Sequence, residues 1–331
     1  MRFYPLPSPP RATGLALLSA AMLAGLMLAY PHTASLSTLA ALLDDTAILI
    51  LLACGQMTVL LTRGVDLSVA ANVALTGMAL ALFNRHWPQL GVWPVLLLAP
   101  ALGALLGALN GLLVWRLRVA PIVATLGTLA IYRGLVFVLS EGAWINSNQL
   151  SAAFLDFPRQ SLLGLTALSW LAPGCAMGVA WWLHYSERGR NIRAAGDNPD
   201  AALYAGIDVG RSQFHAFVVS GALAGLCGYL WVARFGVAYT DVAQGFELQV
   251  IAACVIGGVS INGGVGTVAG VLLGCLFLGV LKNALPLLGL SPFWQMAVSG
   301  LALTVAVVVN ARASTPGRRS FIQSAARGSA Q

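Results

Sequence analysis

Charged side chains are scarce in this sequence. Asp, Glu, Lys and Arg make up 9% of its 331 residues and apolar residues 58%, whereas about a quarter of the residues of a soluble globular protein are charged. This balance excludes a soluble fold. Lysine is rarer still, because Lys282 is the only one, and it lies between Leu281 and Asn283. A nucleotide-binding P-loop needs Gly-Lys-Ser/Thr, so the chain cannot bind ATP through that motif.

Metal-binding and redox motifs are lacking as well. The sequence has no HExxH and no CxxC, and its 4 histidines are scattered near the ends of apolar runs. Its 5 cysteines lie far apart within apolar stretches and predict packing residues, with no disulfide or zinc site. We therefore expect no metal, no cofactor and no catalytic site. The cysteines are Cys54, Cys175, Cys227, Cys254 and Cys275.

Long apolar runs are what the sequence has instead. Each run, as a helix, is long enough to cross about 30 Å of hydrocarbon, and runs such as 95–114 lack the alternation of a membrane barrel. We predict an all-α, polytopic membrane bundle of about ten transmembrane helices. A glycine-rich join after the eighth run marks a possible broken or re-entrant segment. The predicted spans are 14–30, 46–62, 67–83, 93–115, 120–140, 161–183, 213–233, 247–261, 264–284 and 293–311.

The basic residues between these runs predict the orientation. With the N-terminus inside, the inner loops hold thirteen arginines, and only Arg85, Arg159, Arg234 and Lys282 fall outside. This asymmetry places both termini in the cytoplasm, and the basic residues form no stripe typical of nucleic-acid binding. Spans 2–5 and 7–10 then run in opposite directions, as an inverted repeat requires. We predict one membrane domain, 1–313, and a disordered cytoplasmic tail, 314–331.

The polar stretch 187–211 is the most informative loop. Asn198 or Asp200 is suited to cap a short helix and Gly206 to end it. We predict an amphipathic helix lying across the inner face. A plain connector can be much shorter, so we favour a docking surface for a partner protein. A helix that only closes the bundle is the alternative.

Two ionisable residues fall at or near membrane depth. At this depth Asp66 is a candidate functional residue, because a charge within a membrane is unfavourable and is seldom kept without a function. It also stands where span 67–83 begins, so we favour a role in capping this helix and pairing with Arg63. Arg133, inside span 120–140, can snorkel, pair or line an aqueous path.

Glycines recur every four residues in three runs, a pattern that lets helices approach closely. They are Gly103, Gly107 and Gly111, then Gly221 and Gly225, then Gly266, Gly270 and Gly274.

Carboxylates in mid-span, typical of proton- or sodium-driven carriers, are nearly absent, because the 11 acids fall almost wholly in loops or at span ends. Energy for any transport must then come from outside the chain.

Four segments together resemble the permeases of bacterial ABC importers for monosaccharides, of the ribose, xylose and autoinducer-2 kind. They are RGVDLSVA (63–70), APIVATLGTLAIYRG (120–134), GRNIRAAGDNPDAALYAGIDV (189–209) and IAACVIGGVSINGGVGTVAGVLLG (251–274). The first departs from the family's usual Gly-Gly-Ile-Asp-Leu-Ser-Val-Gly, since Arg63 and Ala70 replace its first and last glycines. This departure could alter local helix packing.

The resemblance implies a non-catalytic inner-membrane subunit. Its partners would be a second permease copy or paralogue, two cytoplasmic ABC ATPase domains and a periplasmic sugar-binding protein, with membrane lipid around it. The resemblance makes 185–211 a coupling loop that fits the ATPase, with candidates Gly189, Arg190, Ala194, Gly196, Asp197, Asn198, Ala201, Ala202 and Gly206. Family-motif or pathway candidates are Asp66, Ser68, Thr125 and Arg133. Arg85, Arg159 and Arg234 are candidates for docking the binding protein, and phospholipid anchoring is their alternative role.

For the solute, the segments 132–146, 164–170 and 284–300 are most similar to rhamnose-type permeases, with the autoinducer-2 type next. The predicted function is therefore the translocation path for a monosaccharide, with rhamnose as the first expectation. Autoinducer 2, another pentose or hexose, or an ATP-independent secondary carrier are the alternatives.

Overall fold

The computed structural model describes residues 9–31 and 35–287, with a few isolated positions beyond 287. Most of this part is helical, and the strands are only two residues long. The helices are α1 (Pro9–Ala29), α2 (Leu36–Leu60), α3 (Val69–His86), α4 (Trp93–Trp115), α5 (Pro121–Ser140), α6 (Ala152–Asp156), α7 (Ala167–Tyr185), α8 (Glu187–Asp197), α9 (Pro199–Tyr204), α10 (Val209–Phe235), α11 (Phe246–Ile256) and α12 (Val268–Leu287). The strands are β1 (Ile145–Asn146), β2 (Ser161–Leu162), β3 (Leu165–Thr166) and β4 (Val237–Ala238).

A long helix occupies most of the predicted spans, and α4 has the same bounds as the predicted 93–115. Among the described residues, five helices are long and apolar enough to cross a membrane: α2, α4, α5, α10 and α12. The tenth span, 293–311, and the tail, 314–331, lie outside the described residues apart from isolated positions. A helical membrane fold is thus supported, whereas the count of ten and the inverted repeat stay predictions.

The eighth predicted span, 247–261, is wrong as a continuous helix. Helix α11 has 11 residues, which cover about 16 Å at 1.5 Å per residue, and this is too short to cross the hydrocarbon. Gly258, Gly263 and Gly264 have φ values of 87°, 86° and 73°. Glycine adopts this left-handed region readily and other residues seldom do, so the helix cannot continue. We call residues 257–267 the α11–α12 link and residues 61–68 the α2–α3 link.

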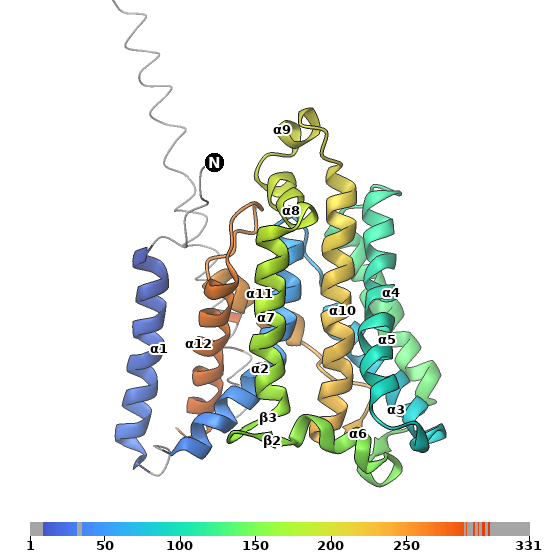
Figure 1. Cartoon of the computed structure of the whole chain (residues 1–331), viewed down its shortest axis with the longest axis vertical. Helices are drawn as coiled ribbons and strands as arrows, with labels where there is room; N and C mark the ends of the chain where they lie inside the picture. Colours follow the sequence, from blue (N-terminus) through green and yellow to red (C-terminus); the bar gives the residue numbers. More distant parts are fainter. Residues whose placement is uncertain are drawn as a thin grey trace, which may run out of the picture.

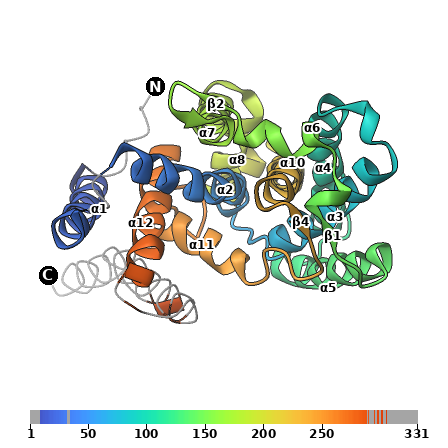
Figure 2. The same ribbon diagram turned by 90° about the horizontal axis from the view of Figure 1, so that it is seen from below.

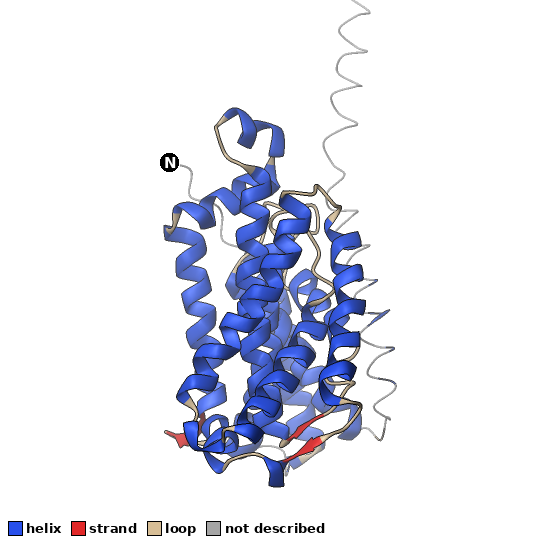
Figure 3. Cartoon of the chain, turned by 90° about the vertical axis from the view of Figure 1, so that its right-hand side faces the viewer, coloured by secondary structure: helices blue, strands red, loops and turns tan. Residues whose placement is uncertain are grey.

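The bundle has two distinct ends. Figure 1 shows α8 and α9 at one end, where α1 also begins, and α6 with β2 and β3 at the other. The strands form two antiparallel pairs, β1 with β4 and β2 with β3, and Figure 3 shows them gathered at the α6 end. We call these the α8–α9 end and the α6 end. The predicted inner loops 116–120 and 185–211 lie at the first of them.

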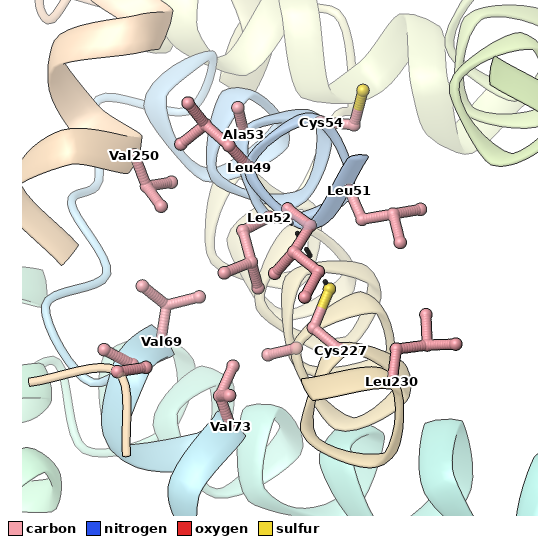
Figure 4. Close-up of a cluster of buried hydrophobic side chains, with 14 of the residues drawn as sticks. Leu49, Leu51, Leu52, Ala53, Cys54, Val69, Val73, Cys227, Leu230 and Val250 are labelled. Carbon is pink, nitrogen blue, oxygen red and sulfur yellow. Dashed lines mark hydrogen bonds between the residues drawn. The ribbon is translucent and has the colours of Figure 1, made fainter. Parts of the chain in front are cut away.

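Helices α2 and α10 form the centre of the bundle, with the other long helices around them (Figure 2). Side chains of α2 such as Leu52 pack with Val73 of α3 and Cys227 of α10, all fully buried (Figure 4). All five cysteines are free, four of them buried and Cys175 half-buried, as expected for packing residues. Helix α5 instead exposes apolar side chains, including Val123 at 62% and Val138 at 71%, as a helix that faces lipid would.

The glycine ridges lie where helices meet. A Cβ added to Gly103 of α4 would lie 2.2 Å from the carbonyl oxygen of Gly221 in α10, and one on Gly225 would lie 2.7 Å from the Gly103 Cα. A Cβ on Gly270 of α12 would lie 2.1 Å from the Gly257 oxygen. Backbone therefore touches backbone at these crossings, which only glycine allows. The close approach predicted from the glycine spacing is confirmed at these positions. Gly266 is the exception, because it precedes α12 and its nearest neighbour is the Val259 side chain.

Candidate functional site

The predicted coupling loop forms two helices, α8 and α9, rather than one. The Ser186 hydroxyl accepts a hydrogen bond from the Gly189 N–H and caps α8. Asn198 caps α9 by accepting from the Ala201 N–H at 3.1 Å, and Gly206 follows the helix with φ of 80°. The sequence signals for α9 were thus right for Asn198 and Gly206. Helix α8 was not predicted, because its polar sequence was taken as part of a loop.

The coupling candidates divide by burial. Gly189, Gly196 and Ala202 are buried within the chain, and Ala194 is half-buried. These small residues therefore pack against the permease itself, and their proposed contact with a partner stays a prediction. The exposed candidates are Arg190, Asp197, Asn198, Ala201 and Gly206.

Helix α9 carries the exposed apolar surface of this loop. Leu203 is 60% exposed and Tyr204 is 94% exposed, and Figure 1 shows α9 standing out at the end of the bundle. These exposed apolar side chains make α9 a candidate surface for a partner. Both residues lay in the predicted helix, but the sequence drew attention to its small residues instead.

Helix α8 sits directly on the two links. A Cβ on Gly196 would lie 1.7 Å from the Leu61 oxygen, and the Gly264 N–H donates to that same oxygen at 3.0 Å. Arg63 donates from Nε to the Gly196 oxygen at 2.7 Å and from Nη2 to the Asp197 oxygen at 2.9 Å. We call α8 with the α2–α3 and α11–α12 links the α8 junction.

A buried polar cluster lies next to the α2–α3 link. The Asp66 carboxylate accepts from the Ser68 N–H at 2.9 Å and from the Ser68 hydroxyl at 2.7 Å. Asn110 of α4 donates to Ser68 Oγ at 2.7 Å, and its Oδ1 accepts from the Thr128 hydroxyl of α5 at 2.6 Å. Ser220 of α10 lies 3.4 Å from Asp66 Oδ2. We call Asp66, Ser68, Asn110, Thr128 and Ser220 the Asp66 cluster.

The contacts predicted for Asp66, a cap on the helix of span 67–83 and a pair with Arg63, are both wrong. Asp66 is 2% exposed, and its carboxylate binds Ser68 rather than the first N–H groups of α3, where Ser68 is the N-cap without a side-chain cap. Arg63 points away to α8. Turned so that its oxygen faces the Asp66 N–H, the Gln56 amide also binds both backbone groups of Asp66 at 3.1 Å. Asp66 therefore holds the link together from within.

The sequence missed three members of the cluster, Asn110, Thr128 and Ser220. Each is a polar residue within an apolar run, and such residues usually face the interior of a bundle and bind one another. That signal was available. The predicted candidates Asp66 and Ser68 are in the cluster, and Thr125 is beside it, with its hydroxyl 3.2 Å from the Val65 oxygen of the link.

Arg133 lies apart from the Asp66 cluster, on the same helix as Thr128 but toward the α6 end. Its Nη1 donates to the Val242 oxygen at 2.7 Å and lies 3.4 Å from the Thr240 oxygen. Those carbonyls belong to the loop between β4 and α11. Arg133 thus ties α5 to a loop that connects two other helices. Of the three predicted roles, snorkelling, pairing or lining an aqueous path, the geometry fits pairing, with carbonyl groups as the partners in place of an acid.

The three arginines predicted to dock a binding protein all lie at the α6 end. Arg234 forms an ion pair with Asp44 at 3.3 Å and another with Asp45, so its charge is engaged within the chain. The Arg159 Nη2 donates to the Arg234 oxygen at 2.9 Å in an exposed position. Arg85 is exposed near the end of α3. Arg85 and Arg159 are therefore the more available to a partner.

Among the described residues, no group of three or more His, Cys, Asp or Glu side chains is placed to hold a metal ion. The chemistry of the arrangement is that of hydrogen bonding and packing. An exposed helix lies at one end, a junction of three segments beneath it, and a buried polar cluster next to the junction.

The comparisons with known proteins agree with this description. The family described as "Branched-chain amino acid transport system / permease component" matches residues 38–307. The autoinducer 2 import system permease protein LsrC of Klebsiella pneumoniae is 37% identical over 84% of this chain and 79% of its own length. The LsrC proteins of Enterobacter sp. and Photorhabdus luminescens are 38% and 35% identical, over 85% and 90% of this chain and 81% and 89% of their own lengths.

No solved structure matches the chain. The named relatives are autoinducer 2 permeases, so the similarity to rhamnose-type permeases is not confirmed. Permeases of this kind are inner-membrane proteins and are not catalytic, which agrees with the exposed apolar helices found here. On the family match over most of the chain and the identity to these relatives, the chain belongs to the family of membrane permease subunits of ABC importers, of the sugar-transporting kind.

Proposed function

We propose that this permease forms the membrane path of an importer for autoinducer 2. The observation that carries the proposal is the 37% identity to an autoinducer 2 permease over 84% of the chain. The alternative solute in our sequence analysis thereby becomes the first choice, and rhamnose the second. Because a binding protein sets much of the specificity in such systems, the test must use the whole importer.

Uptake of labelled autoinducer 2 by cells that express the importer, with and without this chain, tests the solute. We expect uptake only when the chain is present, and competition by excess unlabelled autoinducer 2 but not by rhamnose. Competition by rhamnose alone would overturn the assignment. A deletion strain carrying an unrelated permease of similar size is the control for membrane insertion.

The proposed partners are a second permease copy or a paralogue, two ATPase domains, and a periplasmic binding protein. The exposed side chains of α9 support the α8–α9 end as the ATPase-binding face, since Tyr204 is 94% exposed and Leu203 is 60% exposed. Apolar anchors of this kind commonly supply most of the energy of an interface. The buried Ala202 serves to seat α9, and the exposed Leu203 and Tyr204 contact the partner.

Tyr204→Ser tests this docking surface. We expect normal abundance of the permease, because the side chain packs little on its own chain. ATPase co-purification should be about tenfold weaker or more, as for an aromatic hot spot. Tyr185→Ser is a matched control, because Tyr185 is also exposed, at 65%, and lies just before α8. Equal co-purification of Tyr204→Ser and the wild-type chain would argue against α9 as the docking helix.

The proposed orientation places the α8–α9 end in the cytoplasm. Ser147 and Asn198 are both exposed. Ser147 directly follows β1 at the α6 end, and Asn198 lies between α8 and α9 at the other end. A thiol reagent that cannot cross membranes should modify Ser147→Cys in intact spheroplasts and should modify Asn198→Cys only after lysis. The reverse pattern would overturn the orientation.

A secondary carrier that works without ATP is the remaining alternative. Reconstitution of the purified chain into liposomes without any ATPase separates the two. We expect no uptake of autoinducer 2 by the chain alone and ATP-dependent uptake by the complete importer. Uptake by the chain alone would favour the carrier.

A further inference from the structure

The α2–α3 link contains an arginine in an unfavourable backbone conformation. Arg63 has φ of 64°. In this left-handed region the Cβ of any residue other than glycine crowds the following carbonyl oxygen. Glycine would remove this strain. Something must therefore compensate for the arginine, and the contacts of its side chain show what does.

The Arg63 guanidinium binds the last two carbonyls of α8. It donates to the Gly196 oxygen at 2.7 Å and to the Asp197 oxygen at 2.9 Å, although these residues are more than 130 positions away in the sequence. The last carbonyls of a helix have no partners within it, and they carry the negative end of the helix dipole. A planar cation with donors on two nitrogens reaches both oxygens at once, whereas lysine carries its donors on one nitrogen and fits this place less well.

The α11–α12 link meets α8 at the same point. The Gly264 N–H donates to the Leu61 oxygen at 3.0 Å, and Arg193 of α8 donates to the Gly266 oxygen at 2.9 Å. A Cβ on Gly263 would lie 2.7 Å from the Gly196 oxygen and 2.5 Å from the Arg63 Cγ. The contacts leave no room for α8 to slide between the links without moving them.

The α2–α3 link continues directly into the Asp66 cluster. Three residues after Arg63, Asp66 binds Ser68, and through it Asn110 and Thr128. Gln213 of α10 donates to the Thr62 oxygen at 3.3 Å on the other side of Arg63. A displacement of the link thus reaches α3, α4, α5 and α10.

We propose that Arg63 is a positioning residue that fastens α8 to the α2–α3 link, so that movement of α8 by the ATPase is transmitted to the Asp66 cluster inside the bundle. This inference rests on the proposed function of α8 and α9 as the ATPase-binding face. Arg63 acts through α8 and the link, without touching the solute. Its two hydrogen bonds are exposed or partly exposed, so they can break and form again without a large change in packing.

The test compares Arg63→Gly with Arg118→Gly in the complete importer in liposomes. Arg118 is also exposed, lies just after a long helix at the same end, and has φ of 55°. Both changes remove one positive charge and relieve the same backbone strain, but only the first removes bonds to α8. The readouts are permease abundance, ATPase co-purification, and the number of solute molecules carried per ATP, for whichever of autoinducer 2 and rhamnose the wild-type importer carries.

We expect Arg63→Gly to keep its abundance and its ATPase while transport per ATP falls by about tenfold, a change within the usual range of coupling between two sites. Arg63→Lys should recover part of the ratio. Arg118→Gly should match the wild-type importer. A residue that served only the fold would lower transport in proportion to abundance and leave the ratio unchanged.

The outcomes separate this inference from the proposed function. A wild-type importer that shows no ATP-dependent uptake would overturn the proposed function and this inference with it. If the wild-type importer is active but Arg63→Gly carries as much solute per ATP as Arg118→Gly, only the role of Arg63 is overturned. The same holds if both variants lose the same share of transport per ATP. If Arg63→Gly does not accumulate, the comparison of Arg63→Lys with Arg118→Lys at equal abundance decides in the same way.

Discussion

The crossing of α4 with α10 and the α8 junction both bring backbone against backbone, but the junction adds a side chain that reaches from one segment to the other. At the crossing, Gly103 and Gly221 bring backbone against backbone with no side chain between them. At the junction, Arg63 reaches across with an exposed side chain to bind carbonyls. The first contact can only be kept or lost, because it has no adjustable part. The second has an adjustable part as well, because the Arg63 bonds can break and form again, which suits a place where movement enters the bundle.

The strongest way to break the crossing is Gly103→Leu. A Cβ alone would lie 2.2 Å from the Gly221 oxygen, so the two helices must separate. We expect a loss of more than about 3 kcal/mol, at the upper end for overpacking, and little folded protein in the membrane. Thermal unfolding in detergent measures the loss.

Gly127→Leu in α5 is the matched control, because no atom lies within 4 Å of a Cβ at that position. It should leave the unfolding temperature nearly unchanged. Equal loss from both variants would mean that glycine itself, and not the crossing, governs stability.

Asn110→Leu sharpens the comparison, because Asn110 joins the two regions. It lies on α4 and its side chain binds Ser68 at 2.7 Å and Thr128 at 2.6 Å. Leucine has a similar size but leaves both hydroxyls with one partner fewer, so we expect a loss of about 1 to 3 kcal/mol. Asn283→Leu is the control, since within the described part of the chain the Asn283 side chain binds the Gly279 oxygen of its own helix and no other helix. A smaller loss for Asn110→Leu than for Asn283→Leu would contradict the prediction.

Gln213→Met should give the smallest effect. It removes one hydrogen bond, from Gln213 Nε2 to the Thr62 oxygen at 3.3 Å, and keeps the volume of the side chain. We expect a loss of about 0.5 to 1 kcal/mol, seen as a small fall in the unfolding temperature. Gln249→Met, at a half-buried glutamine of α11, is the reference. A loss as large as that of Gly103→Leu would show that the junction is as rigid as the crossing.

The sequence predicted the regions that depend on local pattern. Apolar length predicted the exact bounds of α4, and glycine spacing identified helix faces of close approach, because both signals are contained in one helix. The spacing did not indicate that α4 meets α10. The cap at Asn198 and the stop at Gly206 were also local. By contrast, Arg63 was paired with Asp66 because the two are near in sequence, and its φ of 64° turns it toward Gly196 instead.

Two other features were beyond local reasoning. The burial of Gly196 and Ala202 depends on how α8 and α9 fold back on the bundle, so small residues meant for a partner were found packed against their own chain. The break after α11 was indicated by its glycines, but its place beneath α8 depends on contacts with Leu61, about 200 residues earlier. Contacts between distant segments leave no mark in a single sequence.

The buried cysteines make the native chain a convenient starting point for experiments with thiol reagents. Four of the five lie in the interior and Cys175 is half-buried, so a bulky reagent that stays in water should leave an intact protein almost unlabelled. Replacing Cys175 alone would then give a silent background for a reporter cysteine at Ser147 or Asn198. The other four thiols can stay in place and keep α2, α10, α11 and α12 packed as they are.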